Sequence, residues 1–197
     1  MFFHIGILGE DDQHIGIIEI LSKRIIEAVL GIQKIEYTTK TTRGSIDGQI
    51  ISSRTYFFEF SNPPCNLAIY VTDTDGKSIK CKNVRDKVTK VYLDNKYPFV
   101  VACPHHEIEQ WIFDERNAAT SELKFKNSVL PYADMDPKQR FERIVREQLR
   151  DYAILPEMVA KKIAERMNLD VLINNSPSFK AFKRDLHDIL KSMNSQI

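Results

Sequence analysis

Residues 65–76 read CNLAIYVTDTDG, an apolar run that passes directly into two aspartates separated by one residue. A short run of apolar and β-branched residues is typical of a strand buried in a parallel sheet. Asp73 and Asp75 follow it at once, although like charges this close repel each other and burial of either one is costly. The stretch therefore predicts a buried strand whose end holds two acids beside a source of positive charge.

The segments around this strand alternate between strand-like and helix-like patterns. Residues 2–8 form a short apolar run, and residues 15–30 carry aliphatic side chains at roughly helical spacing, with Gly31 as the expected stop. Residues 84–94 have the pattern of an amphipathic helix, and residues 97–104 that of another strand. This alternation predicts an α/β fold with a mainly parallel sheet.

Two further β-prone runs, residues 35–41 and 50–60, flank a polar, turn-rich segment. The second half of the chain differs, because its patterns are helical; they cover residues 137–149, 156–167 and 176–193. Phe179 and Phe182 lie on one face of the last helix and are expected to be buried. We therefore expect an α/β core over residues 1–117 and a helical extension, residues 118–197, packed on it.

Composition restricts the classes of protein that fit. Of the 197 residues, 43% are hydrophobic and 28% charged, which excludes a disordered chain, and the net charge of +1 means that any basic surface must be local. Cys65, Cys81 and Cys103 include no close pair, so they predict neither a disulfide framework nor a zinc ribbon and suit a reducing cytosol. No signal-peptide pattern and no apolar run of 18 residues is present. We expect a cytoplasmic protein without a membrane span.

Acidic residues occur at the ends of three predicted strands. They are Glu10 with Asp11 and Asp12, Asp73 with Asp75, and Glu107 with Glu109. Ligands of open α/β sheets collect beyond the carboxyl ends of the strands, and carboxylates that converge there suit Mg²⁺ or Mn²⁺. Such a cation would remove the repulsion between the acids. Two alternatives stay open: Asp-x-Asp-Gly is also a common turn, and the acids at 10–12 also suit a helix N-terminus.

The order of these motifs resembles the Toprim fold of topoisomerases, primases, recombination proteins and OLD-type nucleases. It is most similar to small stand-alone Toprim-like proteins of prokaryotic defence and mobile-element loci. The motifs are a strand ending in Glu10, the DTD at 73–75, EIEQW at 107–111 and SPSFKAF at 176–182. The resemblance implies a Rossmann-like sheet in which Glu10, Asp73 and Asp75 bind Mg²⁺ or Mn²⁺, with Glu109 nearby.

The chain departs from that family in the loop after Glu10. Asp11 replaces the usual glycine, and His14 stands at the fourth position, where the family has an acidic residue. The resemblance implies a metal-dependent nuclease that cleaves phosphodiester bonds in DNA or RNA, in defence against phage or foreign DNA, with an ATPase as a partner protein. Metal ions in such an enzyme polarise the phosphoryl oxygen and help to ionise the attacking water.

Other residue types suit the remaining tasks of a nuclease. His105 and His106 follow a predicted strand and are candidates for proton transfer, since imidazole titrates near neutral pH. The candidate contacts to nucleic-acid phosphates are basic residues close to the acids or to the turn before residue 50: Lys77, Lys80, Lys82 and Arg43. Trp111 is expected in the core rather than stacked on a base.

Two alternative functions remain open at this point. The first is a Toprim-like binding or assembly module whose metal site is structural or lost, which the departure at His14 favours. The second is a receiver-like phosphoacceptor domain, because ILGEDD at residues 7–12 resembles the acidic pair of response regulators and Asp73 would take the place of the acceptor. The absence of a Thr or Ser followed by a Lys-Pro pair at the later strands argues against a receiver.

Overall fold

The structure is a computed structural model and describes residues 2–32, 34–42, 46–92, 97–125, 129–149 and 155–195. Within these ranges four strands form one sheet in which every neighbouring pair is parallel. The order across the sheet is β2-β1-β3-β4, and the strands are β1 (Phe2–Gly9), β2 (Lys34–Thr41), β3 (Leu67–Val71) and β4 (Phe99–Ala102). The predicted α/β class with a parallel sheet is therefore confirmed.

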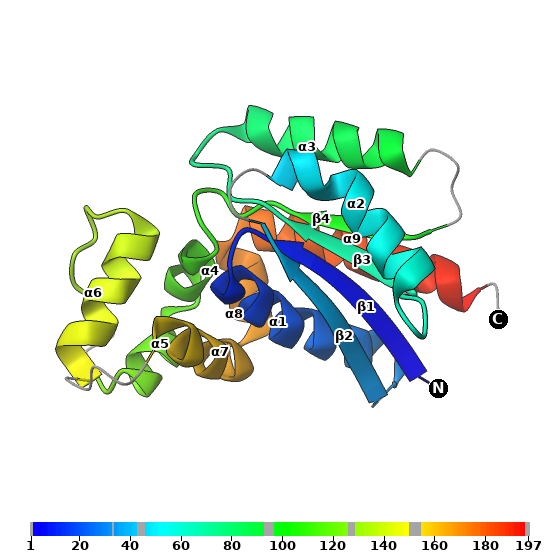
Figure 1. Ribbon diagram of the computed structural model, residues 1–197. Coiled ribbons are helices and arrows are strands. Elements are labelled where there is room, and N and C mark those ends of the chain that lie inside the picture. The colour runs from blue at the N-terminus through cyan, green and yellow to red at the C-terminus, as the bar shows by residue number, and fades with distance from the viewer. Residues whose placement is uncertain are drawn as a thin grey trace.

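Helices cover both faces of this sheet (Figure 1). One face lies under α2 (Ile50–Thr55) and α3 (Ser78–Val91). The other is covered by α1 (Asp12–Leu30) and by α9 (Pro177–Asn194) from the end of the chain, and α7 (Pro156–Arg166) packs on α1. The remaining elements are α4 (Glu109–Asp114), α5 (Arg116–Glu122), α6 (Pro137–Leu149), α8 (Leu169–Asn175), a 3₁₀ turn (Ile46–Gln49) and a π-helical turn (Tyr56–Phe60).

The alternation of side chains along the strands divides the apolar core into two parts. Ile5 and Ile7 of β1 belong to the larger part, together with α1 and the C-terminal helices. Leu8 of β1 and Tyr70 of β3 belong to the smaller part, under α2 and α3. Gly31 ends α1 in the left-handed conformation with φ 65°, as the sequence predicts, because glycine adopts this conformation without steric cost.

Residues 50–60 are helical, so their assignment as a β-prone run is wrong. The buried side chains of this segment are Ile50, Phe57 and Phe58, at the i, i+7 and i+8 spacing of one helical face. Phe57 packs closely on β1, where a Cβ at Gly6 would come within 2.4 Å of the Phe57 ring. Packing against the sheet thus overrides the strand preference of the aromatic residues.

The three predicted helices of the second half are confirmed by α6, α7 and α9. Phe179 and Phe182 are both 0% exposed, and their rings contact Trp111, whose Nε1 donates a hydrogen bond to Ser178 Oγ at 2.9 Å. Trp111 is therefore a core residue. Because α7 and α9 pack on α1, these helices and the sheet share one hydrophobic core.

Cys81 of α3 and Cys103 after β4 form a disulfide, with their Cα atoms 5.7 Å apart. The sequence did not predict this pair, because the two cysteines are 22 residues apart and only the β3-α3-β4 crossover brings them together. Cys65 is a free, buried cysteine. In the described part of the chain, every helix is too short or too polar to cross a membrane.

Replacement of Phe179 by alanine is expected to lower the free energy of unfolding by about 3–5 kcal/mol, because it leaves a cavity against Trp111. Phe60 is 75% exposed, so Phe60→Ala is the matched control and should unfold like the wild type. Denaturant titration followed by circular dichroism measures both. Equal stability of Phe179→Ala and the wild type would contradict the docking of α9.

Candidate functional site

The carboxyl ends of β1, β3 and β4 meet at one edge of the sheet, which we call the carboxyl edge (Figure 1). The loop at residues 73–76, which follows β3, is bound to the loop that follows β4. The N–H groups of Thr74 and Asp75 donate to the carbonyl of His106 at 3.0 and 3.1 Å, and that of Gly76 donates to the carbonyl of His105 at 2.9 Å. The two acid-bearing loops therefore form one unit.

His14 supplies positive charge to Asp73. Its Nδ1 donates to Asp11 Oδ1 at 2.6 Å, and its Nε2 lies 2.8 Å from Asp73 Oδ2. Burial by itself lowers the pKa of His14, but the contacts with Asp11 and Asp73 raise that pKa from 6.5 to about 10. At neutral pH, His14 is thus a buried imidazolium held between two carboxylates.

Lys138 of α6 extends this chain of charges. Its Nζ donates to Asp11 Oδ2 at 2.8 Å. Burial acts to raise the pKa of Asp11, but the contacts with His14 and Lys138 hold that pKa well below its usual range. Cations and anions therefore alternate from α6 through the start of α1 to the end of β3. Their order is Lys138, Asp11, His14 and Asp73. We call these four residues the charge chain.

Glu109, the first residue of α4, is 1% exposed, and within the described residues neither of its carboxyl oxygens has a hydrogen-bond partner. Burial raises the pKa of Glu109 to about 7, and the charge of Asp73 raises it further against the opposing effect of His14. Asp73 Oδ1 is also buried without a hydrogen-bond partner. Buried oxygens of this kind are costly and are the donors that hard cations prefer.

Glu107 lies at the start of the same segment. Burial raises the pKa of Glu107 to about 8, and so does its hydrogen bond with Asp136. The backbone N–H of Lys138 donates to Glu107 Oε2 at 2.7 Å, so the first turn of α6 is bound to the loop before α4. Two carboxyl groups that titrate near neutral pH therefore lie on the same side of the carboxyl edge.

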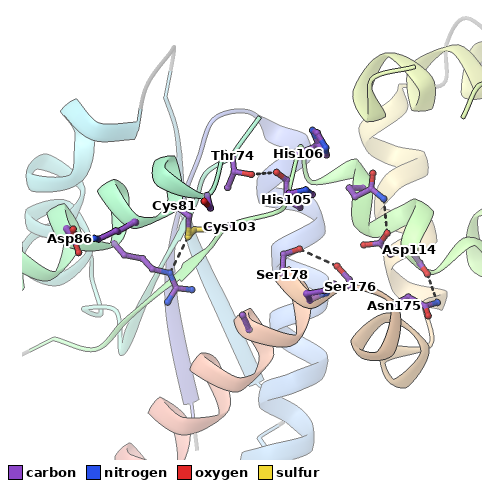
Figure 2. A pocket seen from close by; sticks show the side chains of 16 residues that line it. Thr74, Cys81, Asp86, Cys103, His105, His106, Asp114, Asn175, Ser176 and Ser178 are labelled. Atoms are coloured by element: carbon purple, nitrogen blue, oxygen red, sulfur yellow. Dashed lines mark hydrogen bonds between the residues drawn. A yellow bond between two sulfur atoms is a disulfide. The ribbon is translucent and has the colours of Figure 1, made fainter. Parts of the chain in front are cut away.

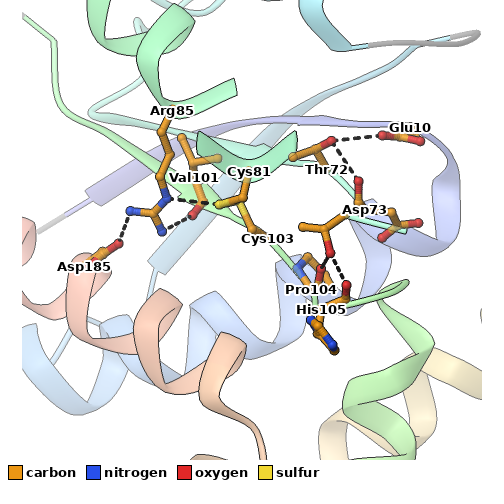
Figure 3. Close-up of a disulfide and its surroundings, with 11 residues drawn as sticks. Glu10, Thr72, Asp73, Cys81, Arg85, Val101, Cys103, Pro104, His105 and Asp185 are labelled. Carbon is orange, nitrogen blue, oxygen red and sulfur yellow. Dashed lines mark hydrogen bonds and ion pairs between the residues drawn. A yellow bond between two sulfur atoms is a disulfide. The ribbon is translucent and has the colours of Figure 1, made fainter. Parts of the chain in front are cut away.

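The other predicted ligands face the solvent side. Thr72 Oγ1 donates to Glu10 Oε1 at 3.1 Å (Figure 3). Lys80 Nζ lies 3.7 Å from Glu10 Oε1 and 3.3 Å from Asp75 Oδ2. The Asp75 side chain is 59% exposed. Glu10 and Asp75 are thus brought together around Lys80, whereas Asp73 turns to His14. In the described ranges no three His, Cys, Asp or Glu side chains are arranged to hold a metal ion.

The predicted histidines and lysines are mostly exposed. His105 and His106 stand in contact beside a cavity of about 950 Å³ between α3 and the start of α9 (Figure 2). Lys82 also lines this cavity, and Lys77 is exposed just before α3. Arg43, the fourth predicted phosphate contact, lies outside the described residues.

The sequence did not identify His14 and Lys138 as members of the site. The spacing Asp11-x-x-His14 does fit a helix N-cap, and the Asp11 side chain accepts the N–H of His14 at 2.9 Å. The contacts of His14 with Asp73 and of Lys138 with Asp11 are long-range, so no local pattern indicates them.

Neither a protein-family model, nor a curated protein, nor a solved structure matches this chain. The comparisons therefore assign no family, activity or ligand. The geometry of the carboxyl edge carries the functional argument.

Replacement of His14 by alanine leaves the buried Asp73 without its cationic partner, which is expected to cost about 3–5 kcal/mol at neutral pH, whereas Asp11 keeps Lys138. Because the folded-state pKa is raised, the stability due to His14 is complete below pH 6.5 and is lost as the pH rises through about 10. The difference between the wild type and His14→Ala should therefore shrink above pH 10. Urea titrations of both proteins, repeated from neutral pH to above pH 10, measure this difference in the free energy of unfolding.

His187→Ala is the control, because His187 lies on α9 far along the chain from the charge chain and its pair with Asp188 is largely exposed. Its stability should follow that of the wild type at every pH. A His14→Ala deficit that stays constant from neutral pH to beyond pH 10 would show that packing, rather than charge, explains the loss.

Proposed function

We propose that the chain is a metal-dependent phosphodiesterase, a nuclease acting on DNA or RNA with Mg²⁺ or Mn²⁺ at the carboxyl edge. The observation that carries the proposal is the group of buried carboxyl oxygens without hydrogen-bond partners on Asp73 and Glu109. A divalent cation would compensate them, and it would supply a polarised phosphoryl oxygen and an ionised water. The parallel sheet with acids at its carboxyl edge supports the Toprim-like resemblance.

The donor set fits a hard cation in its chemistry, since all the candidate donors are carboxylate oxygens. Asp73 and Glu109 would supply the buried donors, whereas Glu10 is not arranged with them, because no three acidic, histidine or cysteine side chains of the described ranges surround one metal position. Asp73 keeps Oδ1 for this role, because its Oδ2 already contacts His14. Asp75 is then less suited to be a ligand than the sequence suggests, since it is exposed and paired with Lys80.

The other roles of a nuclease site, which are phosphate binding and support of the ligands, can be assigned to particular residues. In the metal-free chain Glu109 gains or loses a proton near neutral pH, because burial raises its pKa to about 7, and a bound cation would hold it ionised as a ligand. Lys80 balances Glu10 and Asp75 and, with the exposed Lys77 and Lys82, offers positive charge to phosphates. His14 holds Asp73 in place. A role in defence, an ATPase partner and a cytoplasmic location belong to the same proposal and come from the resemblance.

One observation favours the second candidate, a Toprim-like binding or assembly module without catalysis. Four of the acids already have a cation from the chain itself. His14 pairs with Asp73, and Lys138 pairs with Asp11. Lys80 pairs with both Glu10 and Asp75. A receiver domain gains no such support. Its phosphoacceptor must be reached from solvent, whereas Asp73 is 6% exposed and contacts His14.

Thermal melts with and without Mn²⁺ or Mg²⁺ distinguish the first two candidates. The folded-state pKa of Glu109 is raised from 4.5 to about 7, so its ionised form destabilises the fold as the pH rises through this window. Without metal, Glu109→Gln should thus be about 2–3 kcal/mol more stable than the wild type at about pH 8. A cation at 100 times its Kd should stabilise the wild type by about 2.7 kcal/mol and the variant much less.

Cleavage of supercoiled DNA, single-stranded DNA and tRNA with each metal tests the activity itself. Glu109→Gln and Asp73→Asn should each reduce turnover by orders of magnitude, because these carboxylates act on charge that develops in the transition state. Asp188→Asn, at an exposed position of α9, should cleave like the wild type. If the metals neither stabilise the wild type nor support cleavage, the binding module replaces the nuclease.

A further inference from the structure

The Cys81–Cys103 disulfide lies in the wall of the cavity of about 950 Å³ (Figures 2 and 3). Cys81 is the fourth residue of α3 and is partly exposed, while Cys103 follows β4 directly and is 9% exposed. Both cysteines line the cavity, whose other walls come from the loop after β4 and the first turn of α9. A small molecule in the cavity therefore lies against the two cysteines that form the disulfide.

Arg85 makes the two sulfur atoms unequal. Its Nε donates to Cys81 Sγ at 3.3 Å, its Nη1 donates to Asp185 Oδ2 at 2.8 Å, and its Nη2 donates to the carbonyl of Val101 at 3.2 Å (Figure 3). The guanidinium is thus fixed by α9 and β4 and stays beside Cys81. In the described ranges no hydrogen-bond donor contacts Cys103 Sγ. A cation beside one sulfur stabilises its thiolate.

We propose that this disulfide is an exchangeable one, opened by a small thiol of the glutathione class that enters the cavity, and that Arg85 makes Cys81 the sulfur that leaves as the thiolate. In thiol–disulfide exchange the better leaving group is the sulfur of lower thiol pKa. The incoming thiolate attacks Cys103 Sγ and forms a new S–S bond there. The bond to Cys81 Sγ breaks, and its electron pair remains on Cys81.

A second small thiolate completes the reduction. It attacks the small-molecule sulfur of the mixed disulfide, Cys103 leaves as a thiolate and takes a proton, and the two small thiols depart as their own disulfide. The two electrons that reduce Cys81 and Cys103 come from these thiols. In the reverse direction, the Cys81 thiolate attacks the mixed disulfide at Cys103 and expels the small thiolate.

The charged and titratable groups around the cavity suit a small thiol that carries both carboxylate and amino groups. They are Lys82, Arg85, Asp86, His105, His106 and Asp114. Asp185 of α9 faces the same region and is paired with Arg85. Both signs of charge therefore line the cavity, so the carboxylate and amino groups of a peptide such as glutathione each find opposite charge there.

The disulfide also ties together the two segments that position the carboxyl edge. Lys80, which contacts Glu10 and Asp75, precedes Cys81 in α3. The carbonyls of His105 and His106, just after Cys103, hold the loop at residues 73–76. Opening of the disulfide therefore releases the covalent link between Lys80 and this loop, whether or not the edge carries out catalysis.

The experiment follows the three cysteines by mass spectrometry of the full chain. The oxidised protein is equilibrated in glutathione buffers of increasing reduced fraction, quenched with acid and alkylated. Cys81 and Cys103 should open in the folded protein, with the mixed disulfide on Cys103. In the reduced protein, iodoacetamide should modify Cys81 about tenfold faster than Cys103 at neutral pH. The rate of Cys81 alkylation, plotted against pH, should have its midpoint below about pH 8.5.

Arg85→Gln should slow the alkylation of Cys81 about tenfold and raise the midpoint pH of this reaction. Arg85→Lys keeps the positive charge and should leave most of the Cys81 reactivity in place. Arg184→Gln is the matched control, because Arg184 pairs with the same Asp185 without contact to Cys81. Cys65 is an internal reference, since burial raises the pKa of its thiol to about 11. Melting curves verify the fold of each variant.

Three results would overturn the proposal: a disulfide that opens only in denaturant, equal reactivity of Cys81 and Cys103 in the wild type, or no response of Cys81 to Arg85→Gln. Should Arg85→Gln fail to fold, the wild-type comparison of Cys81 with Cys103 decides the matter.

Discussion

The contact of one imidazolium with two carboxylates holds the carboxyl edge together. His14 lies in the first turn of α1, and its partners are Asp11, the N-cap of the same helix, and Asp73 in the loop after β3. Because His14 and Asp73 are both buried, loss of either one leaves the other charge buried without a partner across the two segments. Lys138 adds α6 to this arrangement through Asp11. The position of α6 at the edge thus depends on charge as well as on apolar packing.

Because of the charge chain, the two aspartates in DTDG have different surroundings in the described part of the chain, rather than forming the one metal site that the sequence predicts. Asp73 is neutralised from within the chain, so its burial does not by itself require a metal ion. Asp75 turns outward, with φ 49°, to Lys80. The charge that lacks a partner belongs instead to Glu109 and to one oxygen of Asp73. These atoms decide between a cation site and an assembly module, because among the buried atoms without a hydrogen-bond partner in the described residues they are the carboxylate oxygens, which a cation would bind.

Sequence patterns predicted the elements that depend on side-chain periodicity and backbone preference within a short segment. The apolar strand at 67–71, the stop of α1 at Gly31 and the buried face of α9 all follow from periodicity and backbone preference. Residues 50–60 did not, because contact with the sheet selects a helix there. The disulfide between Cys81 and Cys103 also depends on the crossover from β3 to β4, which no spacing rule contains.

The candidate site shows the same division. The acids at three strand ends were predicted, and the structure places them at one edge. Their partners were not predicted, because the contact of His14 with Asp73 and that of Lys138 with Asp11 join distant parts of the chain. The sequence therefore located the charges, and only tertiary structure shows which of them compensate one another.

The protonation state of His14 is the most direct test of this account. Imidazole resonances in ¹³C,¹⁵N-labelled protein, followed from acid to alkaline pH and assigned by comparison with His14→Ala, report it without reference to stability or activity. The account predicts that the His14 ring keeps both protons through neutral pH and titrates at about 10. A ring that loses its proton near the ordinary value of 6.5 would contradict it, and Asp73 would then need another source of positive charge.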